Sequence, residues 1–234
     1  MRLLGGRPLI VRVWERVQAM TVSDTVVVAT DAPEIARAVQ AAGGRAVLTR
    51  GDHPSGTDRV AEVASLPEFA GLEIILNVQG DEPFVPASGV CGALAMVSAA
   101  RFAVGTAAAH ADEAILSTPD VVKVVTADDG RALYFSRAAI PALRDPADAE
   151  VRAPLVRQHL GIYAYTREAL ARWVSLPEHP LERAERLEQL RALAAGLAIG
   201  VATIDEPPPG GVDTEDDLLR ANARWGDPYA GWRP

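Results

Sequence analysis

Segments with helical spacing alternate with segments typical of buried strands along most of the chain. Leu9, Val13 and Val17 recur at the spacing of one helix face, and the run 25–29 is apolar and rich in valine. Such alternation predicts an α/β fold in which helices cover both faces of a mostly parallel sheet. The expected helices cover 8–20, 31–42, 57–64, 87–100, 181–195 and a stretch from 214, and the expected strands cover 25–29, 46–48, 73–78, 121–126, 132–135, 159–165 and 199–204.

Composition narrows the class of protein further. The chain has 234 residues, of which 49% are hydrophobic, so one domain spanning 1–234 can bury a core. The single cysteine excludes an internal disulfide, and the sequence contains no apolar run long enough for a membrane span and no signal peptide at its start. These features predict a cytoplasmic protein. The net charge of −8 disfavours nucleic acid as a partner, and an anionic substrate would need a local arginine cluster or a metal ion.

Polar residues follow several of the expected strands, at 30–31, 52–59 and 79–83. In open α/β sheets, ligands bind beyond the carboxyl ends of the strands. Asp81 follows the strongest of the expected strands, and it is either a ligand-binding carboxylate or a turn residue before the next helix. Gly80 favours the first role, because it would let a ligand approach the backbone.

A second carboxylate, Asp213, raises the same alternative. Asp213 or Thr214 is expected to cap the last helix, with Asp216 or Asp217 in its first turn. If Asp81 and Asp213 met, they would suit a hard cation such as Mg²⁺. The spacing alone does not decide whether they meet.

The remaining candidates are one loop and several basic or polar side chains. The stretch Ser-Gly-Thr-Asp-Arg at 55–59 can bind a base or a phosphate, or simply cap a helix. Arg137 and His159 lie beside apolar strands and are either functional or part of surface ion pairs. Glu188 borders the apolar stripe of the expected helix 181–195, whereas Gln189 points about 100° further round, and a solvated face is the alternative for both. The sequence contains no dinucleotide fingerprint, no Walker loop and no serine elbow.

Taken together, these stretches resemble those of the 3-deoxy-manno-octulosonate (KDO) cytidylyltransferases, over nearly the whole chain. The motifs that carry the resemblance occur in the family's order at 55–59, 77–83, 122–125, 133–137, 159–163, 187–191 and 211–214.

The resemblance implies a three-layer, Rossmann-like nucleotide-diphospho-sugar transferase fold with a smaller β-containing lobe that forms a homodimer. It also implies that the anomeric hydroxyl of KDO attacks the α-phosphate of CTP, giving CMP-KDO and pyrophosphate for lipopolysaccharide synthesis. Mg²⁺ is the implied cofactor.

The resemblance also assigns residues. Asp81 and Asp213 match the metal-binding, catalytic carboxylates. The cytidine-binding loop corresponds to Ser55, Gly56, Thr57 and Arg59, and the positions around the sugar correspond to Gln79, Arg137, His159, Glu188 and Gln189.

The family's first strand and its basic, glycine-containing phosphate loop have no counterpart, because family-like sequence starts at Arg2. We therefore expect that the natural protein begins further upstream. Without a central strand, backbone groups of the neighbouring strands would lack partners.

Two other functions stay open. One is transfer of CMP to another sugar acid, such as sialic acid, against which the segments 134–137 and 187–191 argue. The other is a non-catalytic homologue, which only the missing loop supports.

Overall fold

The computed structural model describes residues 1–205 and 207–225, which form two compact units. The first unit comprises residues 1–66, 78–87 and the chain from 208, and the second comprises 67–77 and 88–207. None of the described helices is both long and apolar enough to cross a membrane.

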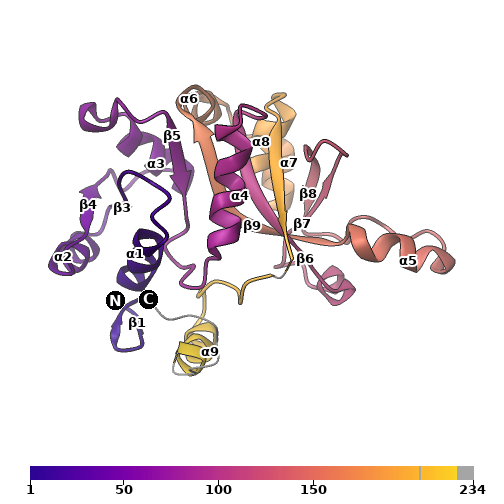
Figure 1. Cartoon of the computed structure of the whole chain (residues 1–234), viewed down its shortest axis with the longest axis horizontal. Coiled ribbons are helices and arrows are strands. Elements are labelled where there is room, and N and C mark those ends of the chain that lie inside the picture. The colour runs from indigo at the N-terminus through magenta and orange to yellow at the C-terminus, as the bar shows by residue number, and fades with distance from the viewer. Residues whose placement is uncertain (206, 226–234) are drawn as a thin grey trace. The chain divides into compact units, whose positions relative to one another are not determined.

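In the first unit, two parallel strands are flanked by helices (Figure 1). The first helix, predicted at 8–20, buries Val11 and Val13. The helices and strands of this unit are β1 (Leu3–Leu4), β2 (Arg7–Pro8), α1 (Leu9–Ala19), β3 (Val27–Thr30), α2 (Pro33–Ala41), β4 (Arg45–Leu48), α3 (Gly56–Ala64) and α9 (Glu215–Trp225).

The last helix packs against the beginning of the chain. Leu4, Val212 and Ala221 are buried together in a small apolar cluster, and the side chain of Asn222 accepts a hydrogen bond from the backbone N–H of Gly5 at 2.9 Å. This packing joins segments more than 200 residues apart in the sequence.

The second unit is built on a six-stranded sheet with the order β10-β6-β9-β7-β8, in which β5 also pairs with β9. Its strands are β5 (Ile74–Asn77), β6 (Val104–His110), β7 (Lys123–Thr126), β8 (Ala132–Ser136), β9 (Arg157–Thr166) and β10 (Ile199–Ile204). Its helices are α4 (Ala87–Ser98), α5 (Ala149–Arg152), α6 (Arg167–Ser175), α7 (Pro180–Glu185) and α8 (Gln189–Ala194).

The α/β class is confirmed, but the sheet is mixed rather than mostly parallel. β6 and β10 are parallel, whereas β9 runs antiparallel to both β5 and β6. The hairpin β7–β8 adds a further antiparallel pair. The ten-residue strand β9 thus runs opposite to β5, β6 and β10 in the middle of the sheet. Alternation of helices and strands in the sequence does not reveal the direction of a strand.

Helix α4 lies close against one face of this sheet (Figure 1). A Cβ atom at Gly105 in β6 would lie 2.2 Å from the carbonyl oxygen of Ala93, so only glycine permits this approach. Because side chains alternate along a strand, the next residue, Thr106, points to the opposite face.

Two further features of this unit concern buried charge and a helix break. Lys123 is fully buried, and its Nζ donates to the carbonyl oxygens of Thr118, Val121 and Arg137 at 2.5–3.0 Å.

The expected helix 181–195 is wrong as a single element. Helix α7 ends at Glu185. The next residue, Arg186, adopts a left-handed conformation with φ of 54°, and α8 begins three residues after Arg186.

Candidate functional site

Asp81 and Asp213 meet in the first unit. The backbone N–H of Val212 donates to the carbonyl oxygen of Asp81 at 2.9 Å, which brings the two segments together. Burial raises the pKa of Asp81, and the neighbouring carboxylate of Asp213 raises it further. The Asp213 carboxylate therefore disfavours ionisation of Asp81, and a bound cation would relieve that cost.

The capping role that was the alternative for Asp213 belongs to Thr214. Thr214 Oγ1 accepts from the backbone N–H of Asp217 at 3.1 Å, and the carboxylate of Asp217 accepts from Thr214 N–H at 2.8 Å. The Asp217 carboxylate accepts from the Thr214 hydroxyl at 2.6 Å as well as from the Thr214 N–H, and these two hydrogen bonds lower the pKa of Asp217 to about 2. Asp213 is thus left to face Asp81.

A third carboxyl group, Glu82, lies beside this pair. A Cβ atom at Gly211 would lie 3.0 Å from Glu82 Oε1, so a larger residue at 211 would require the Glu82 side chain to shift. Burial first, and then the charges of Asp81 and Asp213, raise the pKa of Glu82 to about 7.

The donor set fits Mg²⁺. The described residues contain no group of three metal-ligating side chains arranged as a complete site. Two carboxylates that leave further positions for substrate oxygens are what Mg²⁺ commonly takes from a protein. A Cβ atom at Gly80 would lie 2.9 Å from Ile10 Cδ1, at the end of a flexible side chain.

The loop at 55–59 begins helix α3. Ser55 is its N-cap, accepting from Asp58 N–H at 3.3 Å and donating to the Asp58 carboxylate at 2.6 Å. Thr57 is buried. A Cβ atom at Gly56 would lie 3.8 Å from Gln79 Oε1, so Gln79, assigned to the sugar by resemblance, lies beside this loop.

Arg59 is held by three groups of its own unit. Its guanidinium donates to Thr49 Oγ1 at 2.5 Å and to the carbonyl oxygen of Arg50 at 3.3 Å, and it pairs with Asp31 at 3.2 Å. The structure therefore shows Arg59 joining the ends of β3 and β4 to α3.

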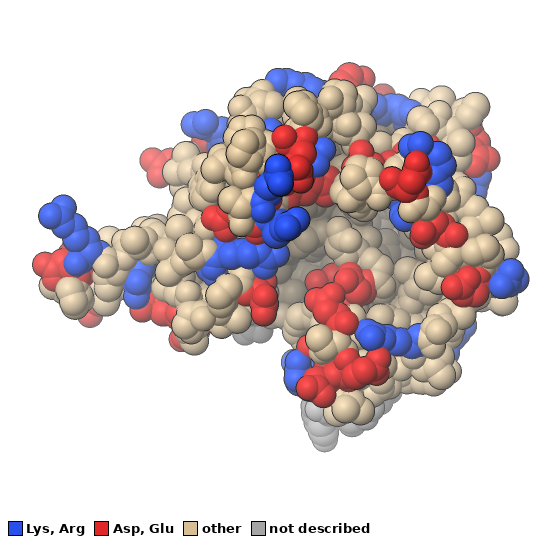
Figure 2. Space-filling view, turned by 180° about the vertical axis from the view of Figure 1, so that it is seen from behind, with Lys and Arg blue, Asp and Glu red and all other residues tan. Residues whose placement is uncertain are grey.

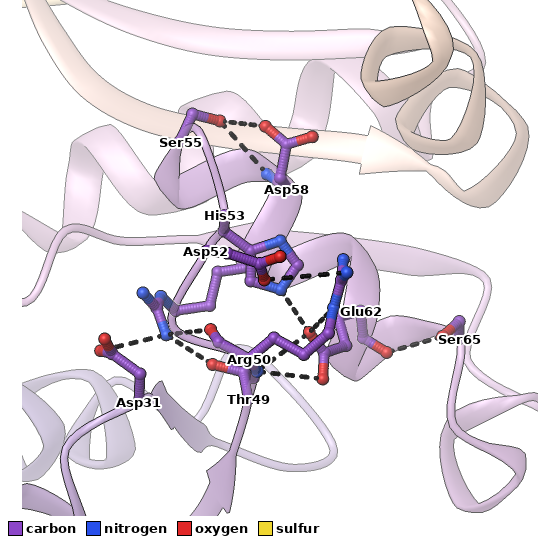
Figure 3. A network of polar contacts seen from close by, with 10 residues as sticks. Asp31, Thr49, Arg50, Asp52, His53, Ser55, Asp58, Glu62 and Ser65 are labelled. Atoms are coloured by element: carbon purple, nitrogen blue, oxygen red, sulfur yellow. Dashed lines mark hydrogen bonds and ion pairs between the residues drawn. The ribbon is translucent and has the colours of Figure 1, made fainter.

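His53 and Glu62 form a second connection under the same loop, one that sequence reasoning missed (Figure 3). His53 Nε2 contacts the Glu62 carboxylate, which also accepts from the backbone N–H of Arg50. The hydrogen bond from His53 is the main cause that lowers the pKa of Glu62. Nothing in the sequence marks this pair, because the contact depends on how the loop folds back onto α3.

In the second unit, Arg137 is anchored by Glu185, which sequence reasoning also missed. The Glu185 carboxylate accepts from Arg137 N–H at 2.9 Å and from Ser136 Oγ at 2.6 Å. The guanidinium of Arg137 donates to the carbonyl oxygens of Glu185 at 2.8 Å and of Pro119 at 3.2 Å. In the described part of the chain this guanidinium forms no ion pair, so its charge is available to an anion.

Glu188 and Gln189 depart from the expected solvated face. Gln189 is buried and Glu188 is half-buried. The charge of Glu188 contributes, after burial and Tyr165, to the raised pKa of Tyr163, so Glu188 lies near β9. The helix break at Arg186 changes the direction of both side chains, and a calculation for one continuous helix therefore fails.

His159 lies on β9 in the same unit. Its Nε2 is 3.0 Å from Thr106 Oγ1, and the edge of Phe135 packs against its ring at a centroid distance of 4.8 Å. Burial lowers the pKa of His159 to about 3, so the imidazole is neutral at physiological pH. It can exchange hydrogen bonds with a sugar but offers no positive charge.

Acidification should lower the free energy of unfolding of the wild type more steeply than that of His159→Gln. Between the ordinary pKa of 6.5 and the folded value of about 3, the unfolded chain binds a proton at His159 that the folded protein excludes. The free energy of unfolding therefore keeps its full value with respect to His159 above pH 6.5. It falls as the pH drops toward 3, by at most about 1.4 kcal/mol per pH unit. Urea unfolding at neutral pH and at about pH 5 measures it, and equal slopes for the two proteins would contradict it.

Acidic and basic side chains are interspersed over the face shown in Figure 2, and no broad basic area appears there. The net charge of −8 is therefore not offset on this face by a large positive patch. Anionic substrates would depend on individual groups such as Arg137.

Comparison with known proteins places the chain. Residues 1–199 match the family model described as cytidylyltransferase. A 3-deoxy-manno-octulosonate cytidylyltransferase of Gemmatimonas aurantiaca is 60% identical over 96% of this chain and 87% of its own length. One from Leptothrix cholodnii is 45% identical over 95% of this chain and 84% of its own.

Solved structures agree. A CMP:2-keto-3-deoxy-manno-octonic acid synthetase complexed with CTP matches with a TM-score of 0.86 at 39% identity, over 94% of this chain and 88% of that one. A 4-diphosphocytidyl-2C-methyl-D-erythritol synthase from Anaerococcus prevotii, 14% identical with a TM-score of 0.61 over 95% of this chain and 90% of its own, shares the fold. The chain therefore belongs to the cytidylyltransferase family, among the 3-deoxy-manno-octulosonate cytidylyltransferases.

Proposed function

We propose that the protein transfers CMP from CTP to KDO and releases pyrophosphate. The meeting of the Asp81 and Asp213 carboxylates is the observation that carries this proposal, because it offers a hard-cation site in a chain of this family. The anomeric oxygen of KDO forms a bond to the α-phosphorus of CTP while the bond to the pyrophosphate oxygen breaks. Such a displacement needs positioning and charge neutralisation more than a covalent intermediate.

In this proposal, Asp81 and Asp213 hold Mg²⁺, which when bound offsets negative charge on the phosphates. The loop at 55–59 receives the nucleotide. Gln79, which lies beside this loop, receives the sugar acid next to the nucleotide. Arg59 acts by holding that loop in place, because its guanidinium is already bound to Asp31 and Thr49. Arg137, His159, Glu188 and Gln189 receive the sugar acid, with the guanidinium of Arg137 suited to its carboxylate.

The finer expectations belong to the same proposal: a cytoplasmic homodimer that supplies lipopolysaccharide synthesis. Leu133 of β8 and Val151 of α5 are apolar and more than half exposed in the second unit, as subunit-contact residues would be in a separated chain.

Pyrophosphate release from CTP tests the function. We expect release that requires both Mg²⁺ and KDO, with sialic acid a poor replacement for KDO. Preference for sialic acid would favour the other sugar-acid transferase. CTP binding by calorimetry without any release would identify a non-catalytic homologue.

Replacing Arg137 by alanine should raise the KM for KDO about tenfold to a hundredfold, as expected for the loss of a charged hydrogen bond. The KM for CTP should change by less than about twofold, because the guanidinium is assigned to the sugar acid. Steady-state kinetics with each substrate varied in turn measures both. Arg144→Ala, which removes an exposed charge from the same unit, is the matched control. Equal increases in both KM values would contradict the assignment.

A further inference from the structure

The hydroxyl group of Thr106 is buried at an irregularity between β6 and β9. Thr106 has no solvent exposure, and the register of the two strands shifts directly after it. Its Oγ1 lies 2.7 Å from the carbonyl oxygen of Ile162, 3.3 Å from that of Leu160 and 3.0 Å from His159 Nε2. One hydroxyl thus faces two carbonyl oxygens and one ring nitrogen.

Counting hydrogen atoms decides the direction of these contacts. A threonine hydroxyl carries one hydrogen and two lone pairs, whereas a carbonyl oxygen can only accept. The shortest contact, to Ile162, takes the hydroxyl hydrogen. His159 Nε2 must then carry a hydrogen and donate it to a lone pair of Thr106 Oγ1.

The environment of His159 supports a neutral ring with a single ring hydrogen. Phe135 and Tyr163 pack around the imidazole, at centroid distances of 4.8 and 5.5 Å. Among the described residues, no carboxylate pairs with His159, and burial strongly lowers its pKa. With its one hydrogen on Nε2, the ring presents Nδ1 as a hydrogen-bond acceptor.

We propose that Thr106 is a positioning residue that holds His159 in the Nε2–H tautomer, so that Nδ1 accepts a hydrogen bond from a hydroxyl group of the sugar acid. The identity of that ligand rests on the proposed function. Nδ1 as an acceptor recognises a hydroxyl group and disfavours a carboxylate, which has no hydrogen to donate. The carboxylate of the sugar acid is therefore bound by Arg137.

The tautomer can be measured without any turnover. In protein labelled with ¹⁵N-histidine, long-range proton–nitrogen correlations distinguish protonated Nε2 from protonated Nδ1. At neutral pH we expect the Nε2–H form for His159, identified by its absence from a His159→Gln spectrum. An Nδ1–H form in the wild type would overturn the proposal, whether or not the protein is a KDO transferase.

Two variants of Thr106 test its role. Thr106→Ser keeps the hydroxyl and should keep the tautomer, whereas Thr106→Val keeps the shape and should give a mixture of tautomers. The valine variant should also raise the KM for KDO about fivefold, as expected for the loss of roughly one hydrogen bond, with the KM for CTP unchanged and both restored by serine. An unchanged tautomer in Thr106→Val, or equal effects on both KM values, would overturn the positioning role. If Thr106→Val does not fold, Thr106→Ser decides. Loss of the Nε2–H tautomer in Thr106→Ser, which keeps the hydroxyl, would overturn the positioning role.

Discussion

Replacing Asp81 or Asp213 by asparagine should reduce the turnover of CMP transfer by at least about a hundredfold. Each substitution removes one of the two carboxylates proposed to hold Mg²⁺ next to the phosphates of CTP. Asparagine keeps the size of the side chain, and it removes a charge that raises the cost of ionising its neighbour. The stability of the folded protein should therefore stay the same or rise.

The measurement is pyrophosphate release over a range of Mg²⁺ concentrations, combined with urea unfolding of each variant. Asp216→Asn is the matched control, because it removes an exposed carboxylate from the first turn of α9, three residues after Asp213 in the sequence. It should retain wild-type turnover. Near-normal turnover of Asp81→Asn or Asp213→Asn, with an unchanged Mg²⁺ requirement, would exclude that residue as a metal ligand.

The largest loss of stability is expected at the buried ion pair between Glu182 of α7 and Arg191 of α8. Two hydrogen bonds of 2.5 and 2.7 Å join the side chains, which are only 12% and 9% exposed. Glu182→Ala or Arg191→Ala would each remove the counter-charge of a buried partner. We expect each substitution to lower the free energy of unfolding by about 3–5 kcal/mol.

A neighbouring exposed pair provides the control. Arg183 and Glu178 are 72% and 52% exposed, so Arg183→Ala should change the free energy of unfolding by less than about 1 kcal/mol. The double variant Glu182→Leu with Arg191→Met should lose less than either single alanine variant, because no charge stays buried. A loss at Arg191→Ala no larger than at Arg183→Ala would show that the buried pair contributes little.

The sequence predicts most elements of the fold, but two failures have physical causes. The strand β6 was not predicted, because its three alanines and its glycine carry no strand signal. Those small residues are fully buried between β9, β10 and α4, and the tertiary structure decides their conformation. The break at Arg186 was also missed, because no glycine or proline marks it. The two members of the buried pair, Glu182 and Arg191, lie on either side of this break.

For the candidate site, the sequence indicates which residues to consider but not how they are arranged. Asp81 and Asp213 are 132 positions apart, and contacts of the fold such as the hydrogen bond from Val212 N–H bring them together. The roles of Glu185 and Thr106 depend on contacts between distant strands and helices. A pattern along one segment cannot reveal such partners, whereas their hydrogen-bond geometry in the fold does.

Lys123 is the only lysine of the chain, and this gives its burial a practical consequence. An amine must be exposed and uncharged to react with an acylating reagent. The Nζ of Lys123 instead donates to three carbonyl oxygens and has no contact with solvent. Acylation at this residue therefore requires that β7 first separate from its surroundings. Apart from the α-amino group of the chain, Lys123 is thus the one amine reporter, and its rate of modification measures how often the second unit opens.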